Sequence, residues 1–185
     1  MNKIKSFALA LAIAGTVSGA ALAQSGSMQD PMVGGAAMYP QKNIVQNAMN
    51  SKDHTTLVAL VKQAGLVQTL EGPGPFTVFA PTNEAFGKLS KATVDKVTGD
   101  NALLVKVLTY HVVPGRIDSK QLMGMIQSGG GKAMLKTVNG EDLTATMDGN
   151  TIVLTDAHGG MSRITTADVY QSNGVIHVVD TVLIP

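Results

Sequence analysis

From residue 132 onward the chain is a series of short segments in which apolar and polar residues alternate, separated by two-residue turn signals. Alternation with a period of two is typical of half-buried β-strands, and Asn-Gly or Asp-Gly between such segments favours the tight turns of antiparallel hairpins. The turn signals are Asn139-Gly140, Asp148-Gly149 and Asn173-Gly174. The predicted strands are 134–138, 142–147, 151–155, 163–171 and 175–184. The second half of the chain is therefore predicted to form an antiparallel meander.

The half before residue 132 has apolar residues at helical spacing and one early strand. The strand is predicted over 76–80, a run of aromatic and β-branched residues between a Gly-Pro-Gly-Pro breaker and Pro81. Short polar side chains precede the helical segments, and we predict N-caps at Asp53, Thr82, Ser90, Asp100 and Asp118. Helices first and a meander last predict an α+β fold.

Residues 1–23 have the features of a secretory signal peptide. Lys3 and Lys5 precede an apolar run over 7–17, and Ala21-Leu22-Ala23 supplies the small-x-small pattern of a cleavage site. The apolar run is too short to cross a hydrocarbon core, which needs about 20 residues. Residues 24–41 are rich in Ser, Gly, Met and Pro without periodicity, so we predict a flexible lead there and one folded domain over 42–185.

Charge and cysteine content restrict the possible partners and compartments. The chain has 14 Lys and Arg against 13 Asp and Glu, and no cysteine. Loss of the leader removes two lysines, so no basic excess remains for nucleic-acid phosphates or for an anionic membrane surface. Without cysteine there are no disulfides and no lipid-modified cysteine after the leader, and the domain must be stabilised by its own core. We expect a secreted or periplasmic protein with no nucleic-acid partner and no membrane anchor after cleavage.

The sequence offers little material for catalysis. None of the four histidines lies in an HExxH motif or at metal-ligand spacing. His111 and His177 have β-branched neighbours, which favours half-buried strand positions with each ring satisfied by a backbone carbonyl or a hydroxyl over a two-histidine metal or acid–base site. Asp156 and His158 precede Ser162, but groups so close in sequence rarely form a triad, and a glycine-rich loop explains them more simply. We predict no enzyme, no catalytic residue, no metal and no cofactor.

Three motifs resemble the signature boxes of the fasciclin domain family. The first box is matched by Phe-Thr-Val-Phe-Ala-Pro-Thr-Asn-Glu-Ala-Phe at 76–86, the central tyrosine–histidine motif by Tyr-His-Val-Val-Pro-Gly at 110–115, and the second box by 174–185. They occur in the family's order and span nearly the whole chain from about Asn43. The chain is most similar to small exported single-domain bacterial members, including symbiosis-induced ones. The resemblance implies a β-wedge of about seven strands with an N-terminal helical layer, and no cofactor.

The resemblance also implies a function in adhesion. In animal relatives, integrin contact is attributed to the tyrosine–histidine motif and to an Asp-Ile pair before the second box. These positions correspond here to Tyr110 and His111, and to Asp168 and Val169, with valine in place of isoleucine. We predict that these four residues bind an extracellular or envelope protein or polysaccharide. The binding face is expected to be an exposed one near Tyr110, Asp168 and the helices around Leu57 and Leu122.

Some fasciclin-like relatives carry carotenoids, which implies a second possibility for this chain. In this alternative, a small apolar ligand such as a carotenoid or lipid binds at the soft apolar stretch Leu122, Met123, Met125 and Ile126.

Overall fold

The computed structural model describes residues 30–185. The predicted signal peptide and the first residues of the predicted lead, up to residue 29, lie outside the described part of the chain. Between residues 30 and 185, no helix has the length and apolar character that a membrane span requires.

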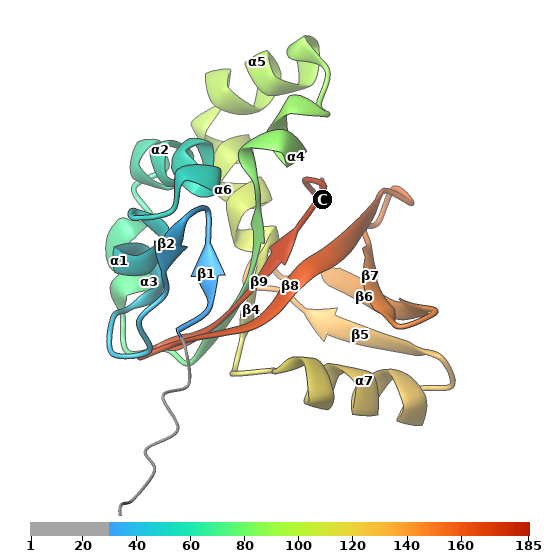
Figure 1. The fold of residues 1–185 in the computed structure, drawn as a ribbon. Helices are drawn as coiled ribbons and strands as arrows, with labels where there is room; N and C mark the ends of the chain where they lie inside the picture. The colour runs from blue at the N-terminus through green and yellow to red at the C-terminus, as the bar shows by residue number, and fades with distance from the viewer. Residues whose placement is uncertain (1–29) are drawn as a thin grey trace, which may run out of the picture.

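The centre of the molecule is a curled seven-stranded sheet, shown in Figure 1. Its strands in spatial order are β4 (Val112–Pro114), β3 (Phe76–Pro81), β9 (Gly174–Val179), β8 (Met161–Gln171), β7 (Thr151–Thr155), β6 (Asp142–Asp148) and β5 (Lys132–Lys136). All neighbours are antiparallel except β3 and β9, which run parallel. The two edges approach each other, because the Val138 N–H just after β5 donates to the Val112 carbonyl of β4 at 2.8 Å.

The α+β prediction with about seven strands and an N-terminal helical layer is confirmed. The last strand, however, ends at Val179 and not at residue 184. All six residues of β9 are buried, as its two apolar faces predict, and β9 lies between β3 and β8 in the middle of the sheet.

Six α-helices and one short 3-10 helix form the layer that precedes the meander, and α7 lies apart from them beside β5 (Figure 1). Their bounds are α1 (Ile44–Ala48), η1 (Lys52–His54), α2 (Thr55–Gln63), α3 (Val67–Glu71), α4 (Asn83–Gly87), α5 (Lys91–Gly99), α6 (Asn101–Tyr110) and α7 (Ser119–Ser128).

Four of the five predicted N-caps are confirmed. The side chains of Thr82, Ser90, Asp100 and Asp118 accept backbone N–H bonds at the starts of α4, α5, α6 and α7. Asp53 is wrong as a cap, because it lies inside η1 and α2 begins two residues later.

The folded part of the chain begins before the predicted boundary at residue 42. The strands β1 (Met32–Val33) and β2 (Ala36–Ala37) form a small hairpin, and Val33 and Met38 are buried in the helical core. The prediction of a flexible lead over 24–41 is therefore wrong for its second half. Met38, one of the methionines in the predicted lead, is 2% exposed. The sequence did not indicate this, because burial of a side chain in a tertiary contact is not visible in local periodicity.

Two hydrophobic clusters stabilise the fold. One lies between the helical layer and the sheet and includes Leu60, Leu104 and Ile176. The other fills the interior of the curled sheet under α7 and includes Leu122, Leu143 and Leu154. The predicted soft apolar stretch on α7 therefore contributes mainly to the core: Leu122 and Ile126 are buried and Met123 is partly buried against the cluster, which leaves Met125 as the exposed member.

Candidate functional site

Tyr110, the last residue of α6, is fully buried. Its hydroxyl donates to the Asp142 carbonyl at 3.0 Å, and burial raises the pKa of the phenol. The side chain thus connects the end of a helix to β6 across the interior of the sheet. In this position it is a packing residue, and a partner has no access to it.

His111 follows directly and is also buried, at the C-cap of α6 rather than on the predicted strand. Its Nδ1–H donates to the Val107 carbonyl at 2.8 Å, and its Nε2 accepts the Leu183 N–H at 3.1 Å. These two partners fix one neutral tautomer. Burial lowers the pKa of His111 to about 4, so the ring is neutral at physiological pH.

His177 has the same arrangement on β9. Its Nε2–H donates to the Ile117 carbonyl at 2.9 Å, and its Nδ1 accepts the Asp168 N–H at 3.3 Å. The ring stacks on Phe79 with centroids 5.7 Å apart, and burial lowers its pKa. Both histidines thus use both ring nitrogens on backbone groups, which confirms the prediction of buried, satisfied imidazoles.

Asp168 lies in an irregular part of β8, where the register with β9 shifts between Thr166 and Val169. Its φ of 60° is the one left-handed non-glycine conformation among the described residues. Its carboxylate accepts the Ser119 N–H at 2.7 Å and the Ser119 hydroxyl at 2.5 Å, and so attaches the bulge to the first turn of α7. Val169 beside it is 1% exposed and belongs to the helical core.

The prediction of an exposed face near Tyr110 and Asp168 is therefore wrong at Tyr110, and the four predicted binding residues do not form one surface. Three of the four are buried, and only Asp168 is partly accessible. The tyrosine and histidine belong to contacts around Asp142 and Leu183, while the aspartate and valine belong to the β8 bulge. That these residues bind a partner stays a prediction that nothing tests.

The surface beside Asp168 does carry exposed groups that the sequence did not single out. Tyr170 is 42% exposed, and the charges of Asp168, Asp118 and Arg116 act on it. Burial, followed by the two carboxylates, raises the pKa of Tyr170, while the guanidinium opposes them. Arg116 is held by the Gln171 carbonyl at 3.1 Å. We call these four residues the Tyr170 surface.

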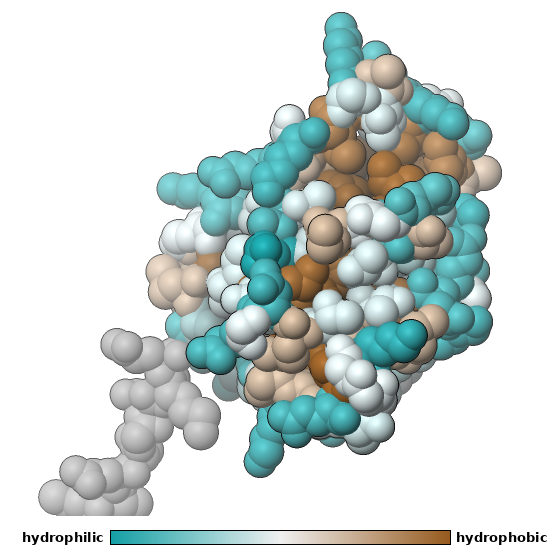
Figure 2. All heavy atoms as spheres, turned by 90° about the vertical axis from the view of Figure 1, so that its right-hand side faces the viewer, coloured by the Kyte–Doolittle hydropathy of each residue, from teal (hydrophilic) through white to brown (hydrophobic). Residues whose placement is uncertain are grey.

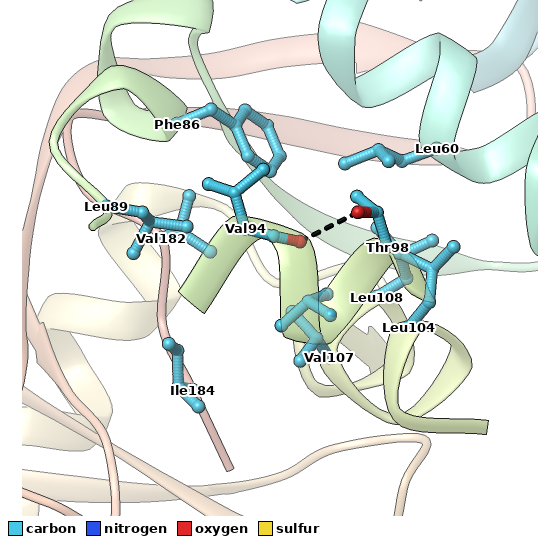
Figure 3. Close-up of a pocket in the computed structure, with 11 residues that line it drawn as sticks. Leu60, Phe86, Leu89, Val94, Thr98, Leu104, Val107, Leu108, Val182 and Ile184 are labelled. Atoms are coloured by element: carbon cyan, nitrogen blue, oxygen red, sulfur yellow. Dashed lines mark hydrogen bonds between the residues drawn. The ribbon is translucent and has the colours of Figure 1, made fainter. Parts of the chain in front are cut away.

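A second candidate is an apolar pocket between α2, α4, α5, α6 and the segment after β9 (Figure 3). Residues lining it include Leu60, Phe86, Val94, Leu108 and Ile184. The one polar side chain in the lining, Thr98, donates its hydroxyl to the Val94 carbonyl at 2.8 Å, as the dashed line in Figure 3 shows. The cavity volume is about 20 Å³, so only a water-sized space is open inside.

This part of the molecule is also the most apolar region of the face in Figure 2, where brown side chains gather at the top. The pocket lies on the helical layer, and its lining contains no residue of the stretch around Leu122 that the sequence suggested for an apolar ligand.

The three residues that could suggest a catalytic triad, Asp156, His158 and Ser162, lie in a network of backbone contacts. One oxygen of Asp156 accepts the N–H groups of His158 and Gly160, and the other accepts the Ile184 N–H. The Ser162 hydroxyl donates to the Thr181 carbonyl at 2.7 Å and accepts the Thr181 N–H at 3.1 Å. Within residues 30–185, no cluster of three or more His, Asp or Glu side chains is placed to hold a metal.

The fold is that of a FAS1 domain. It is similar to the FAS1 domain pair from the insect cell adhesion molecule Fasciclin I, with a TM-score of 0.66 and 18% identity over 78% of this chain and 51% of that one. A family model described as Fasciclin domain matches residues 52–185. The chain belongs to the fasciclin domain family.

Bacterial relatives match over most of the chain. Protein sll1483 of Synechocystis sp. (strain ATCC 27184 / PCC 6803 / Kazusa) is 42% identical over 83% of this chain and 79% of its own length. The cell surface glycolipoprotein MPB83 of Mycobacterium bovis is 33% identical over 87% of this chain and 63% of its own length.

Proposed function

We propose that this fasciclin domain is a non-enzymatic interaction module, exported through the predicted signal peptide and acting at the cell envelope or outside the cell. The name of MPB83 as a cell surface glycolipoprotein and that of Fasciclin I as a cell adhesion molecule support this location and role. The histidine, serine and aspartate side chains that chemistry would need are engaged in backbone contacts.

The observation that carries the proposal is the Tyr170 surface. Tyrosine and arginine are the residue types enriched in protein interfaces, and aromatic side chains provide a large contact area at a low entropic cost. Here Asp168 lies in a bulge that Ser119 fixes, and Tyr170 follows the bulge in the ladder with β9, so the backbone positions of both are set before a partner arrives. Left-handed conformations of non-glycine residues such as Asp168 cluster at functional sites. The proposed partner is an envelope or extracellular protein or polysaccharide.

Quantitative binding to surface extracts tests this proposal. Immobilised protein with Tyr170→Ala and Arg116→Ala should retain at most a tenth of the wild-type signal, since interface tyrosines and arginines often contribute more than 1 kcal/mol each. Tyr39→Ala is the matched control, because Tyr39 is 41% exposed and is not one of the four residues of the Tyr170 surface. Equal binding by the two tyrosine variants would contradict a role of the Tyr170 surface.

A second function is favoured by the lining of the pocket in Figure 3, in which every side chain but Thr98 is apolar. A carotenoid or lipid chain would enter there if α5 moved away from α6, since the space present is water-sized. Protein isolated from its natural source should then show a bound mass in native mass spectrometry, and Val94→Phe should remove it. A natural-source sample at the apo mass would refute this alternative.

A further inference from the structure

β5 is an edge strand of the sheet. Outside its ladder with β6, residues 132–136 make no backbone hydrogen bond to any other part of residues 30–185. The Val138 N–H points to β4, and the Lys132 carbonyl faces the α carbon of Gly129. Because backbone groups alternate along a strand, the N–H and C=O groups of Met134 and Lys136 point to the same outer side. Beside Met134, between the end of α7 and the contact of Val138 with β4, these unpaired groups are a template for another extended chain.

A groove lies directly along this edge. It has a volume of about 430 Å³ and is lined by Met125, Ser128, Gly129, Lys132, Ala133 and Met134, that is, by the end of α7 and the start of β5. Figure 1 shows the helix running beside the strand. The volume is in the range of about 300–1,000 Å³ that is usual for ligand sites. A strand edge next to a helix suits recognition by strand addition, and two exposed methionines give an adaptable apolar lining.

The charge pattern of β5 opposes a second copy of this chain in the groove. The strand reads Lys-Ala-Met-Leu-Lys, symmetric in charge about Met134. Antiparallel pairing with itself about that residue would place Lys132 opposite Lys136 at both ends, and like charges directly opposite each other destabilise a pair.

The existing neighbour β6 shows which sequence the lysines favour. Asp142 lies opposite Lys136, with a salt bridge of 3.3 Å, and Thr144 lies opposite Met134. Leu143 and Ala145, which alternate with Asp142 and Thr144 along β6, point to the other face of the sheet and are buried. A strand that alternates acidic or hydroxyl residues with apolar ones is therefore complementary to β5.

We propose that the β5 edge and α7 form a docking site for an extended segment of a partner protein, with acidic residues four positions apart and apolar residues between them. The acidic side chains pair with Lys132 and Lys136 on the outer face of the sheet. The apolar side chains lie in the groove against Met125. The segment hydrogen-bonds to the backbone of Met134, between the end of α7 and the contact with β4. This site lies on a different strand from the Tyr170 surface.

The test is titration of the ¹⁵N-labelled protein with the peptide acetyl-Thr-Glu-Val-Thr-Val-Glu-Thr-amide, followed by NMR. We expect the amide of Met134 to shift and to gain protection from hydrogen exchange. The peptide with lysine in place of both glutamates should bind at least tenfold more weakly. In the variant Lys132→Glu/Lys136→Glu the preference should reverse, since each end then carries the opposite charge.

The control variant is Lys91→Glu/Lys96→Glu on α5, which changes the net charge equally at two exposed lysines away from the groove. It should bind the glutamate peptide within twofold of the wild-type protein. Equal binding of both peptides, or shifts confined to other strands, would overturn the proposal. Protection of the outward-facing Met134 amide without peptide would also overturn it: if the protection grows with protein concentration the occupant is a second copy, and if it is constant the occupant is the protein's own chain.

Discussion

The two histidines of the signature motifs act in the same way, as neutral connectors between backbone segments. Each donates one N–H to a carbonyl, of Val107 or Ile117, and accepts one backbone N–H, from Leu183 or Asp168. Only a neutral imidazole can donate and accept at once, because both nitrogens of the protonated ring are donors. Protonation would therefore remove one buried hydrogen bond from each ring and leave a charge in the core.

This arrangement makes stability depend on pH. The pKa of His111 is about 4 in the folded protein against an ordinary value of 6.5, and burial lowers the pKa of His54 and His177 as well. Because the folded pKa is the lower one, the stabilisation is complete above about pH 6.5 and is lost as the pH falls toward 4. His111 alone should account for a decrease of about 3 kcal/mol in the free energy of unfolding across this window, measured by urea denaturation.

The variant His111→Gln isolates this contribution. It removes the titrating group, so its free energy of unfolding should fall less steeply between pH 6.5 and 4 than that of the wild-type protein. The difference in slope should correspond to about one proton fewer taken up on unfolding. Gln127→Asn, at an exposed side chain that does not titrate, should leave the slope unchanged. Parallel pH profiles for the wild-type protein and His111→Gln would show that this ring does not govern the acid response.

Asp168 allows a test of its backbone conformation separately from its carboxylate. Asp168→Gly and Asp168→Ala both lose the hydrogen bonds to Ser119, but only alanine must adopt a φ of 60° with a Cβ atom. The left-handed region costs a residue with a Cβ about 1 kcal/mol relative to glycine. Thermal and urea denaturation should therefore rank the glycine variant above the alanine variant by about that amount. Equal stability would mean that the bulge relaxes out of this conformation.

At the scale of elements, a residue of the first signature box, Asn83, caps the N-terminus of α2, which lies more than 20 residues earlier in the sequence. The Asn83 side chain accepts the Thr56 N–H at 2.9 Å at the start of α2, and its amide donates to the Lys52 carbonyl at 2.8 Å. No side chain at the N-cap position of α2 itself caps that helix. Asn83 thus supplies the missing cap from the first turn of α4 and fixes the two helices relative to each other.

Removing this side chain should cost about as much as removing a local cap. Asn83→Ala is expected to lower the free energy of unfolding by about 1–2 kcal/mol, since two hydrogen bonds of a helix end lose their partner. Asn101→Ala, an exposed asparagine in the first turn of α6, is the matched control and should change it by less than about 0.5 kcal/mol. Equal effects of the two substitutions would show that water replaces the Asn83 contacts at no cost.

The elements that the sequence predicts well are those specified by their own residues. The strand predicted at 151–155 between turn signals is β7, with the same bounds. Four of the N-caps predicted from short polar side chains are also confirmed. The failures all depend on contacts distant in sequence. Asp53 resembles a cap locally, yet Asn83 performs that role, and the hairpin around Val33 is ordered by a core formed later in the chain.

The candidate site divides in the same way. The motif around Tyr110 and His111 is recognisable because the fold depends on its residues, but whether they face solvent is decided by β6 and Leu183. The residues around Tyr170 in the sequence give no sign that this tyrosine is exposed or that charged groups surround it. Its exposure and its charged neighbours arise only when the chain after β4 is placed against the β8 bulge.

At the scale of the whole molecule, the segment after β9 joins the two hydrophobic clusters. Val182 is buried in the cluster under the helical layer, and the next residue, Leu183, is fully buried in the cluster inside the curled sheet. His111 holds the Leu183 N–H, and Asp156 holds the Ile184 N–H. One extended segment thus contacts both cores and is anchored by hydrogen bonds from two directions, so the cores should unfold as one unit.

The variant Leu183→Ala tests this cooperativity. Loss of a fully buried leucine should lower the free energy of unfolding by about 2–5 kcal/mol. If the cores are coupled, hydrogen exchange should show the same loss for the amide of Leu60 in α2 as for that of Ala145 in β6, although only the second belongs to the cluster that contains Leu183. Met161→Ala, at a side chain 66% exposed, should change neither amide by more than about 0.5 kcal/mol. A loss confined to Ala145 would mean that the two cores open independently and that the segment after β9 packs against both without coupling them.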